Sequence, residues 1–161
     1  MNIFVLDLDP EKCARFHTDR HVNKMLIESA QMLSTAHHVS GSEAPYKKTH
    51  VNHPCNLWTR ESIENYDWLL SLAENLLGEY NHRYGNKVHE TARVLQWLQK
   101  NKPDLPSLGV TDRPMAMPDN YARENVVESY RRYYVNEKTD GATWTDRPKP
   151  HFVEDSSYLQ S

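Results

Sequence analysis

The spacing of apolar residues along the chain predicts a mainly α protein. Apolar positions recur every three or four residues over 11–38, 54–84 and 88–101, and again in a segment that begins near Pro118. Each of these four stretches is long enough for a helix with one buried face. Residues 3–8 alternate weakly and are rich in β-forming side chains, which predicts a short strand or an extended lead-in.

Proline and glycine mark where these elements begin and end. Pro54 suits the first turn of the second helix, where a missing N–H costs nothing, and Gly85 suits its C-terminal end. A proline-bearing loop fills 102–118, and the chain after residue 139 is irregular. We therefore expect a single compact helical domain over 1–153, with an irregular C-terminal arm and a weakly ordered tail over 154–161.

Composition limits the classes of protein to which the chain can belong. The 161 residues carry a net charge of −3, which argues against a general polyanion binder but leaves room for a local basic groove. The longest apolar runs fall short of the roughly 20 residues that span a bilayer, so we expect no membrane partner and a cytoplasmic location. Two cysteines are too few for a disulfide framework and are expected to be reduced.

The most informative pattern is a polar stripe in the first predicted helix. Its members recur at steps of four, three, four and three residues, and at about 100° per residue they fall within roughly 80° of one another. They border the predicted core face, where partial burial tunes pKa values. The stripe is either the edge of an active site or a helix flank with satisfied histidines; it consists of His17, His21, Lys24, Glu28 and Gln31.

Lys24 and Glu28 form the central candidate pair within this stripe. A lysine beside histidines loses its proton more readily than a free one, and a neutral amine attacks a sugar C1′ or a carbonyl to form a Schiff base. Glu28 lies one turn further on, where it can act as an acid or base. The alternative is a simple Lys24–Glu28 ion pair at helical spacing, which contributes little. We take Lys24, Glu28, His21 and His17 as the candidate catalytic residues.

A second cluster precedes Pro54, in a loop rich in cations, imidazoles and amides. Such a loop, leading into a helix N-terminus, is a plausible phosphate site because free N–H groups and the helix dipole favour an anion. The alternative is that His53 caps the helix and the lysines are solvated. Together with Gln31 and Arg60, the candidate substrate-binding residues of this region are Lys47, Lys48, His50, His53 and Asn56.

Two further interpretations concern metals and stacked bases. His17 and His21, with His50 or His53, have a spacing that could hold a metal ion, but no carboxylate partner is evident. We therefore expect no metal and no cofactor. Trp144 and Arg147 could stack an unpaired base and hold its phosphate, although an aromatic clip that closes the domain is the commoner arrangement.

These residues resemble a group of small phage-encoded proteins described as similar to pyrimidine-dimer DNA glycosylases of the endonuclease V type. The shared pattern covers nearly the whole chain. It comprises Asp19-Arg20-His21-Val22 with Lys24, Glu28 and Gln31; Tyr46, His50, His53-Pro54-Cys55 and Trp58; Ala116-Met117-Pro118 and Tyr121; Tyr130-Arg131, Tyr133-Tyr134, Trp144 and Arg147.

The resemblance implies an all-helical enzyme that flips a base out of DNA and cleaves its N-glycosidic bond. In those glycosylases an N-terminal amine is the nucleophile and a glutamate assists it. This sequence departs from them in its acidic net charge and in Asn2, which is too large for routine removal of Met1. The chemistry carried over to this chain therefore places the amine on Lys24 and the acid–base group on Glu28.

Three functions follow as hypotheses. The first is glycosylase-type cleavage at a pyrimidine base in DNA, with DNA or a pyrimidine nucleotide as the partner. The second is a transferase that modifies a hydroxymethylpyrimidine-type base in DNA. The third is a noncatalytic phage protein that binds a nucleotide or inhibits a host protein, which the acidic net charge also fits.

Overall fold

The computed structural model describes residues 1–160, which form six α-helices and three short 3₁₀ turns with no β-strand. The prediction of a mainly α single domain is confirmed. In chain order the elements are α1 Pro10–Phe16, α2 Asp19–Val39, α3 Pro54–Thr59, α4 Ile63–Tyr84, α5 Thr91–Lys100, η1 Asp119–Tyr121, α6 Val126–Glu137, η2 His151–Val153 and η3 Ser156–Tyr158.

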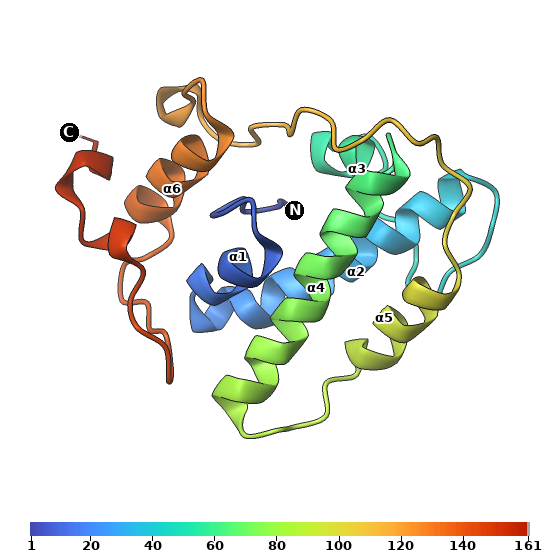
Figure 1. Ribbon diagram of the computed structural model, residues 1–161, viewed down its shortest axis with the longest axis horizontal. Coiled ribbons are helices and arrows are strands. Elements are labelled where there is room, and N and C mark those ends of the chain that lie inside the picture. The colour runs from blue at the N-terminus through green and yellow to red at the C-terminus, as the bar shows by residue number, and fades with distance from the viewer. Residues whose placement is uncertain (161) are drawn as a thin grey trace.

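The long helices α2 and α4 cross at the centre of the molecule and supply the largest share of its core (Figure 1). Leu26 and Leu33 lie two turns apart on α2, and Leu69 and Leu76 repeat that spacing on α4; all four are fully buried. This is the apolar stripe that the sequence pattern predicts. Helices α1, α3 and α5 pack against this pair, whereas α6 packs with the three 3₁₀ turns.

The first predicted helix is in fact two helices, so the expectation of one element over 11–38 is wrong. His17 ends α1 in an extended conformation, with φ −67° and ψ 139°. Thr18 then caps α2, because its Oγ1 accepts the N–H of His21 at 3.3 Å. Because of this break, His17 does not lie in α2 with the other members of the stripe.

The second predicted helix is also interrupted, so one element over 54–84 is likewise wrong. Helix α3 ends at Arg60, and Ser62 caps α4 by accepting the N–H of Asn65 at 3.1 Å. The outer boundaries are nevertheless confirmed. Pro54 occupies the first turn of α3, and Gly85 ends α4 at φ 76°, the left-handed conformation that favours glycine.

The N-terminal segment is extended and lies in the middle of the molecule, between α6 and the crossing helices (Figure 1). Residues 2–6 are buried. The Asn2 side chain fixes this segment, because its Nδ2 donates to Ala116 O at 2.8 Å and its Oδ1 accepts from the Tyr130 hydroxyl at 3.1 Å. The extended lead-in is therefore confirmed, and it carries the N-terminus to the centre of the fold.

The C-terminal part differs from the prediction at the start of its helix. Pro118 precedes the 3₁₀ turn η1, and α6 begins only at Val126. Beyond α6 the chain turns back along that helix. Two residues of α6 bind the predicted tail: Arg132 donates to Ser157 O at 2.9 Å, and Asn136 donates to Tyr158 O at 2.8 Å. The last residue of that tail, Ser161, lies outside the described residues.

None of the helices within residues 1–160 combines the length and the apolar character needed to cross a bilayer.

Candidate active site

The α-amino group of Met1 lies 3.2 Å from Oε1 of Glu28. Both groups are largely shielded from water, with side-chain exposures of 3% for Met1 and 13% for Glu28. Glu28 projects from the middle of α2, and the extended N-terminal segment brings the amine to it. An amine in contact with a carboxylate that can take its proton is the arrangement that activates a nitrogen nucleophile.

Asn56 on α3 helps to hold Met1 in this position. Its Nδ2 lies 3.2 Å from Met1 Sδ and also donates to the main-chain oxygens of Thr49 at 3.0 Å and His50 at 2.8 Å. Asn56 is almost completely buried. It therefore joins the predicted phosphate-binding loop to the N-terminus, rather than presenting its amide to a substrate as the sequence suggested.

His53 takes the capping role that the sequence suggested as the alternative to a phosphate contact. Its Nδ1 accepts the N–H of Cys55 at 3.0 Å, so it is the N-cap of α3. Burial lowers the pKa of His53, and the positive charges of the N-terminus and His50 lower it further, whereas Glu28 opposes them. These effects favour the neutral form of the His53 imidazole, and they show that the ring lies within electrostatic reach of the Met1 amine.

A hollow of about 110 Å³, which we call the amine pocket, opens at the Met1–Glu28 pair. Lys24 is exposed at its edge, and no Lys24–Glu28 ion pair forms within residues 1–160. The predicted pair is therefore replaced by one in which Met1 supplies the amine. The residues lining the amine pocket are Met1, Asn2, Phe4, Lys24, Met25, Glu28, Tyr133 and Lys138.

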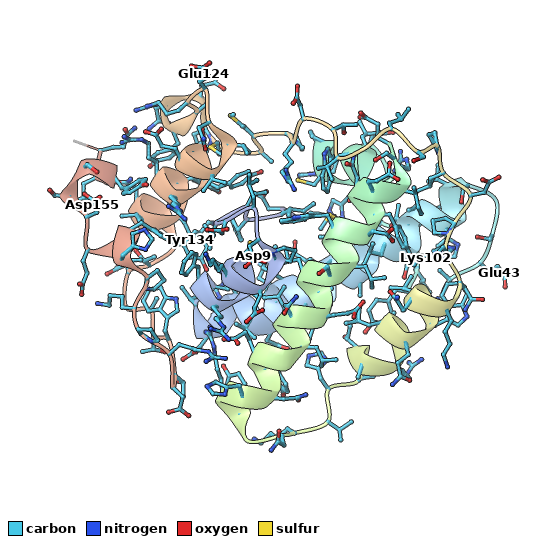
Figure 2. The ribbon with its side chains drawn as sticks, viewed as in Figure 1. Asp9, Glu43, Lys102, Glu124, Tyr134 and Asp155 are labelled. Atoms are coloured by element: carbon cyan, nitrogen blue, oxygen red, sulfur yellow. The ribbon has the colours of Figure 1, made fainter. Side chains whose placement is uncertain are left out.

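His21 lines a second, larger hollow of about 420 Å³, which we call the His21 pocket. Its Nδ1 lies 2.7 Å from the hydroxyl of Tyr134 on α6, which Figure 2 labels. Burial, together with positive charges that include His17 and Lys24, lowers the pKa of His21 to about 3. The ring is therefore neutral near pH 7, which favours hydrogen bonding over the acid–base role expected from the sequence.

His17 is a core histidine, and the prediction that it is catalytic is not supported by its position. It is fully buried, and its Nδ1 lies 2.7 Å from Cys13 O. Burial lowers its pKa to about 4. The ring packs edge-on against Phe4 and lines neither pocket.

Helix α2 borders the lysine-bearing loop at Gln31. Gln31 lies beside Lys47 and Lys48 around a third hollow of about 490 Å³, which we call the Gln31 pocket. Lys24, Glu28 and Gln31 thus run along one side of α2, from the His21 pocket past the amine pocket to the Gln31 pocket.

We found no family model that matches the chain, and no curated protein or solved structure with significant similarity to it. The candidate site is therefore interpreted from its own geometry.

Trp144 and Arg147 do not join these pockets. The Trp144 indole donates to Phe16 O at 2.9 Å, and Arg147 makes two hydrogen bonds to Glu79, at 3.0 and 2.7 Å. Both residues therefore belong to the clip that closes the domain, the alternative that the sequence favoured. Arg60 ends α3 and lines none of the three pockets.

No group of three or more His, Cys, Asp or Glu side chains within 1–160 is arranged to hold a metal ion. The helical spacing that suggested a shared ion between His17 and His21 is lost at the break between α1 and α2.

Sequence reasoning missed three contributors to the site. The amine of Met1 was implied only by the resemblance and was set aside because of Asn2. Tyr133 lies in α6 and Lys138 is the C-cap of that helix, and both line the amine pocket. They are more than 100 positions from Glu28 in the sequence. The residue pattern carried no signal for that contact.

Proposed function

We propose that the protein is a DNA glycosylase that acts on a pyrimidine base through the α-amino group of Met1, assisted by Glu28. The observation that carries this proposal is the 3.2 Å contact between that amine and Glu28 Oε1, beside a hollow that opens to solvent. The resemblance to N-terminal-amine glycosylases supports it independently. The proposal requires Met1 to be the first residue of the active chain and to be unmodified.

The proposed reaction begins when Glu28 takes a proton from the Met1 ammonium group. The nitrogen lone pair then attacks C1′ of the nucleotide, and the C1′–N bond breaks as the base leaves with its electron pair and takes up the proton held by Glu28. The new amine adduct loses a proton to the restored carboxylate. That proton passes to O4′ as the C1′–O4′ bond breaks, which opens the sugar ring and leaves an imine. Water hydrolyses the imine and regenerates the amine.

The surroundings of the pair suit a nucleotide turned out of a duplex. Lys24 and Gln31 are seven residues apart on α2, which corresponds to about 10 Å along the helix. That distance lets one strand pass the His21 pocket, the amine pocket and the Gln31 pocket in turn. A damaged or modified base costs less to extrude than a normal pair, so selectivity does not need a large basic surface.

The test is trapping with borohydride, which reduces an imine to a stable covalent link. Wild-type protein, with its N-terminus verified by intact mass, is incubated with duplexes that contain one ultraviolet-damaged or modified pyrimidine. We expect release of the base and a trapped protein–DNA adduct that peptide mapping places on Met1. A variant with Gly-Ser added before Met1 should give neither product, because the amine would be displaced from Glu28.

The alternatives have different outcomes in the same assay. Trapping that persists in the extended variant and maps to Lys24 would return the nucleophile to the lysine predicted from the sequence. DNA that gains mass without losing a base would indicate the transferase. Failure to release any base from every substrate would reject the glycosylase and favour a binding protein.

A further inference from the structure

The His21 pocket lies between the first turn of α2, the C-terminal end of α6 and the loop over 139–143. Lys24 and Lys138 line both this pocket and the amine pocket, so the two hollows adjoin at the two lysines. Lys138 is held there by the ring of Tyr133, whose centroid is 5.4 Å from Nζ. A ligand in the His21 pocket would therefore be next to the proposed reaction centre.

Hydrogen bonding around Tyr134 favours one tautomer of His21. The Tyr134 hydroxyl accepts the N–H of Thr18 at 3.0 Å and has one proton to donate. Its nearest acceptor is His21 Nδ1 at 2.7 Å, since Thr18 Oγ1 lies at 3.4 Å. In a neutral ring, a proton accepted at Nδ1 leaves the N–H at Nε2.

That Nε2–H group donates to no acceptor within residues 1–160. The residue is only 5% exposed, but Nε2 is not one of its fully buried atoms, and the ring lines the pocket. The pocket therefore gives a ligand direct access to a hydrogen-bond donor on an otherwise buried ring.

The charges around the pocket favour an anionic acceptor. Arg20, Lys24 and Lys138 contribute three positive charges, against the two carboxylates of Glu137 and Asp140. Glu137 also interacts with the Tyr121 hydroxyl, whose pKa it raises. The imidazole is the only aromatic ring in the lining, so a stacked base would find no other flat partner here.

We propose that the His21 pocket binds a phosphate group of the DNA strand, with His21 Nε2–H, Lys24 and Lys138 as its donors. The pocket as a phosphate site stands on its own geometry, whereas the assignment of that phosphate to DNA rests on the proposed function. The phosphate would belong to the linkage next to the attacked nucleotide, because both lysines also border the amine pocket.

The first experiment follows the imidazole nitrogens of His21 by NMR in protein with ¹⁵N-labelled histidine. The spectrum of the free protein should show Nε2 protonated and Nδ1 unprotonated. Addition of inorganic phosphate, or of a duplex with one tetrahydrofuran abasic site, should shift the Nε2–H signal. An unprotonated Nε2, or a signal that neither probe moves, would overturn the proposal.

Surface variants then test the pocket without disturbing the core. Lys138→Ala should weaken the binding of both probes about three- to fivefold, the effect of one partly exposed charge contact. Asp140→Asn should tighten binding by a similar factor, because it removes a repelling carboxylate. Lys12→Ala removes an exposed lysine of α1 and is the matched control. Equal affinities for the Lys138 and Lys12 variants would contradict the assignment.

Two further readouts identify the source of the phosphate and test the glycosylase and the phosphate site separately. Abasic duplex that displaces inorganic phosphate identifies the DNA backbone as the ligand, whereas nucleotide monophosphates that displace it better would reject the DNA assignment. Binding needs no reaction, so a protein that releases no base yet binds phosphate at His21 refutes only the glycosylase. Base release without any effect at His21 refutes only the phosphate site.

Discussion

Two clusters of buried charge in this protein differ in how completely their members are paired. One is the Glu79 network, formed by Glu79, Arg83, Arg147 and Asp19, and the other is the Met1–Glu28 pair. Glu79 accepts hydrogen bonds from both arginines. Arg83 also donates to the main-chain oxygens of His17 at 2.7 Å and Arg15 at 2.9 Å. Met1 and Glu28 share one 3.2 Å contact beside a hollow.

This difference distinguishes structure from chemistry among residues of similar type. A fully paired charge has no capacity left for a substrate, and removing a partner leaves its counterpart buried and unpaired. A singly paired amine beside a hollow can exchange its proton and its partner at modest cost. The same reasoning gives Arg147 a structural role and supports the proposal that the N-terminal amine is the reactive group.

The largest effect is expected when the Glu79 network is broken. Arg83→Ala removes a guanidinium whose side chain is fully shielded and leaves Glu79 and Asp19 short of a partner. We expect the free energy of unfolding to fall by about 3–5 kcal/mol, measured by urea denaturation. Arg15→Ala is the control, because its pair with Glu11 is about half exposed and should contribute less than about 1 kcal/mol. Similar losses in the two variants would contradict the contrast between buried and exposed pairs.

The next effect is a dependence of stability on pH that comes from His17. Its pKa is 6.5 in the unfolded chain and about 4 in the fold, because burial disfavours the charged ring. Between pH 6.5 and 4 the unfolded chain therefore binds a proton that the folded chain refuses. Lowering the pH through this window should reduce the free energy of unfolding by about 3 kcal/mol through His17 alone. His21, whose pKa is also lowered, adds a loss of the same sign. Both losses should be absent above pH 7.

The stability that the Glu79 network contributes should be lost at a lower pH than the His17 contribution. Burial raises the pKa of Glu79, but hydrogen bonds from Arg147 and Arg83 outweigh it and lower the pKa below 4.5. Its stabilisation is present above that value and is lost as the pH falls further. Replacing His17 with Gln should therefore reduce the slope between pH 6.5 and 4 to the part that His21 contributes, while leaving the loss at lower pH. An unchanged slope would show that His17 does not titrate as its burial implies.

A third effect tests the chemistry of the Met1–Glu28 pair. Glu28→Gln keeps the shape of the side chain and removes the group that takes the proton. We expect the rate of base release to fall about 100-fold, the lower limit for a lost general base, in single-turnover assays. Phosphate binding at the His21 pocket should be unchanged, because Glu28 does not line it. Base release within threefold of wild type would remove Glu28 from the mechanism.

The helical fold was predictable because apolar spacing and end signals are local. Pro54 begins α3 and Gly85 ends α4, as expected, and the buried faces of α2 and α4 follow the sequence period. The two missed breaks also have local signals, since Thr18 and Ser62 are good N-caps. The continuous apolar pattern across each break masked those caps.

The site was predictable only where its residues share a helix or a neighbouring loop. Glu28, Lys24 and Gln31 were found because they follow the period of α2. The Met1 amine and Lys138 reach the same place through tertiary packing, with Asn2 tied to Tyr130 of α6. No periodicity within a segment reports such contacts.

The smallest effect on the fold is expected from Lys24→Ala. This variant also discriminates most sharply between the Met1 amine and the Lys24 amine as the nucleophile. Lys24 is exposed at the edge of the amine pocket and forms no ion pair within residues 1–160, so its removal should change the free energy of unfolding by about 1 kcal/mol or less. Borohydride trapping should persist because Met1 retains its contact with Glu28, while affinity for the abasic duplex should fall about three- to fivefold through the lost charge contact. If Lys24→Ala loses trapping although its mass shows an unmodified Met1, the nucleophile is Lys24. The Met1 amine would then pair with Glu28 without taking part in the reaction. The two measurements together decide which amine reacts, since a phosphate contact affects affinity and a nucleophile affects covalent capture.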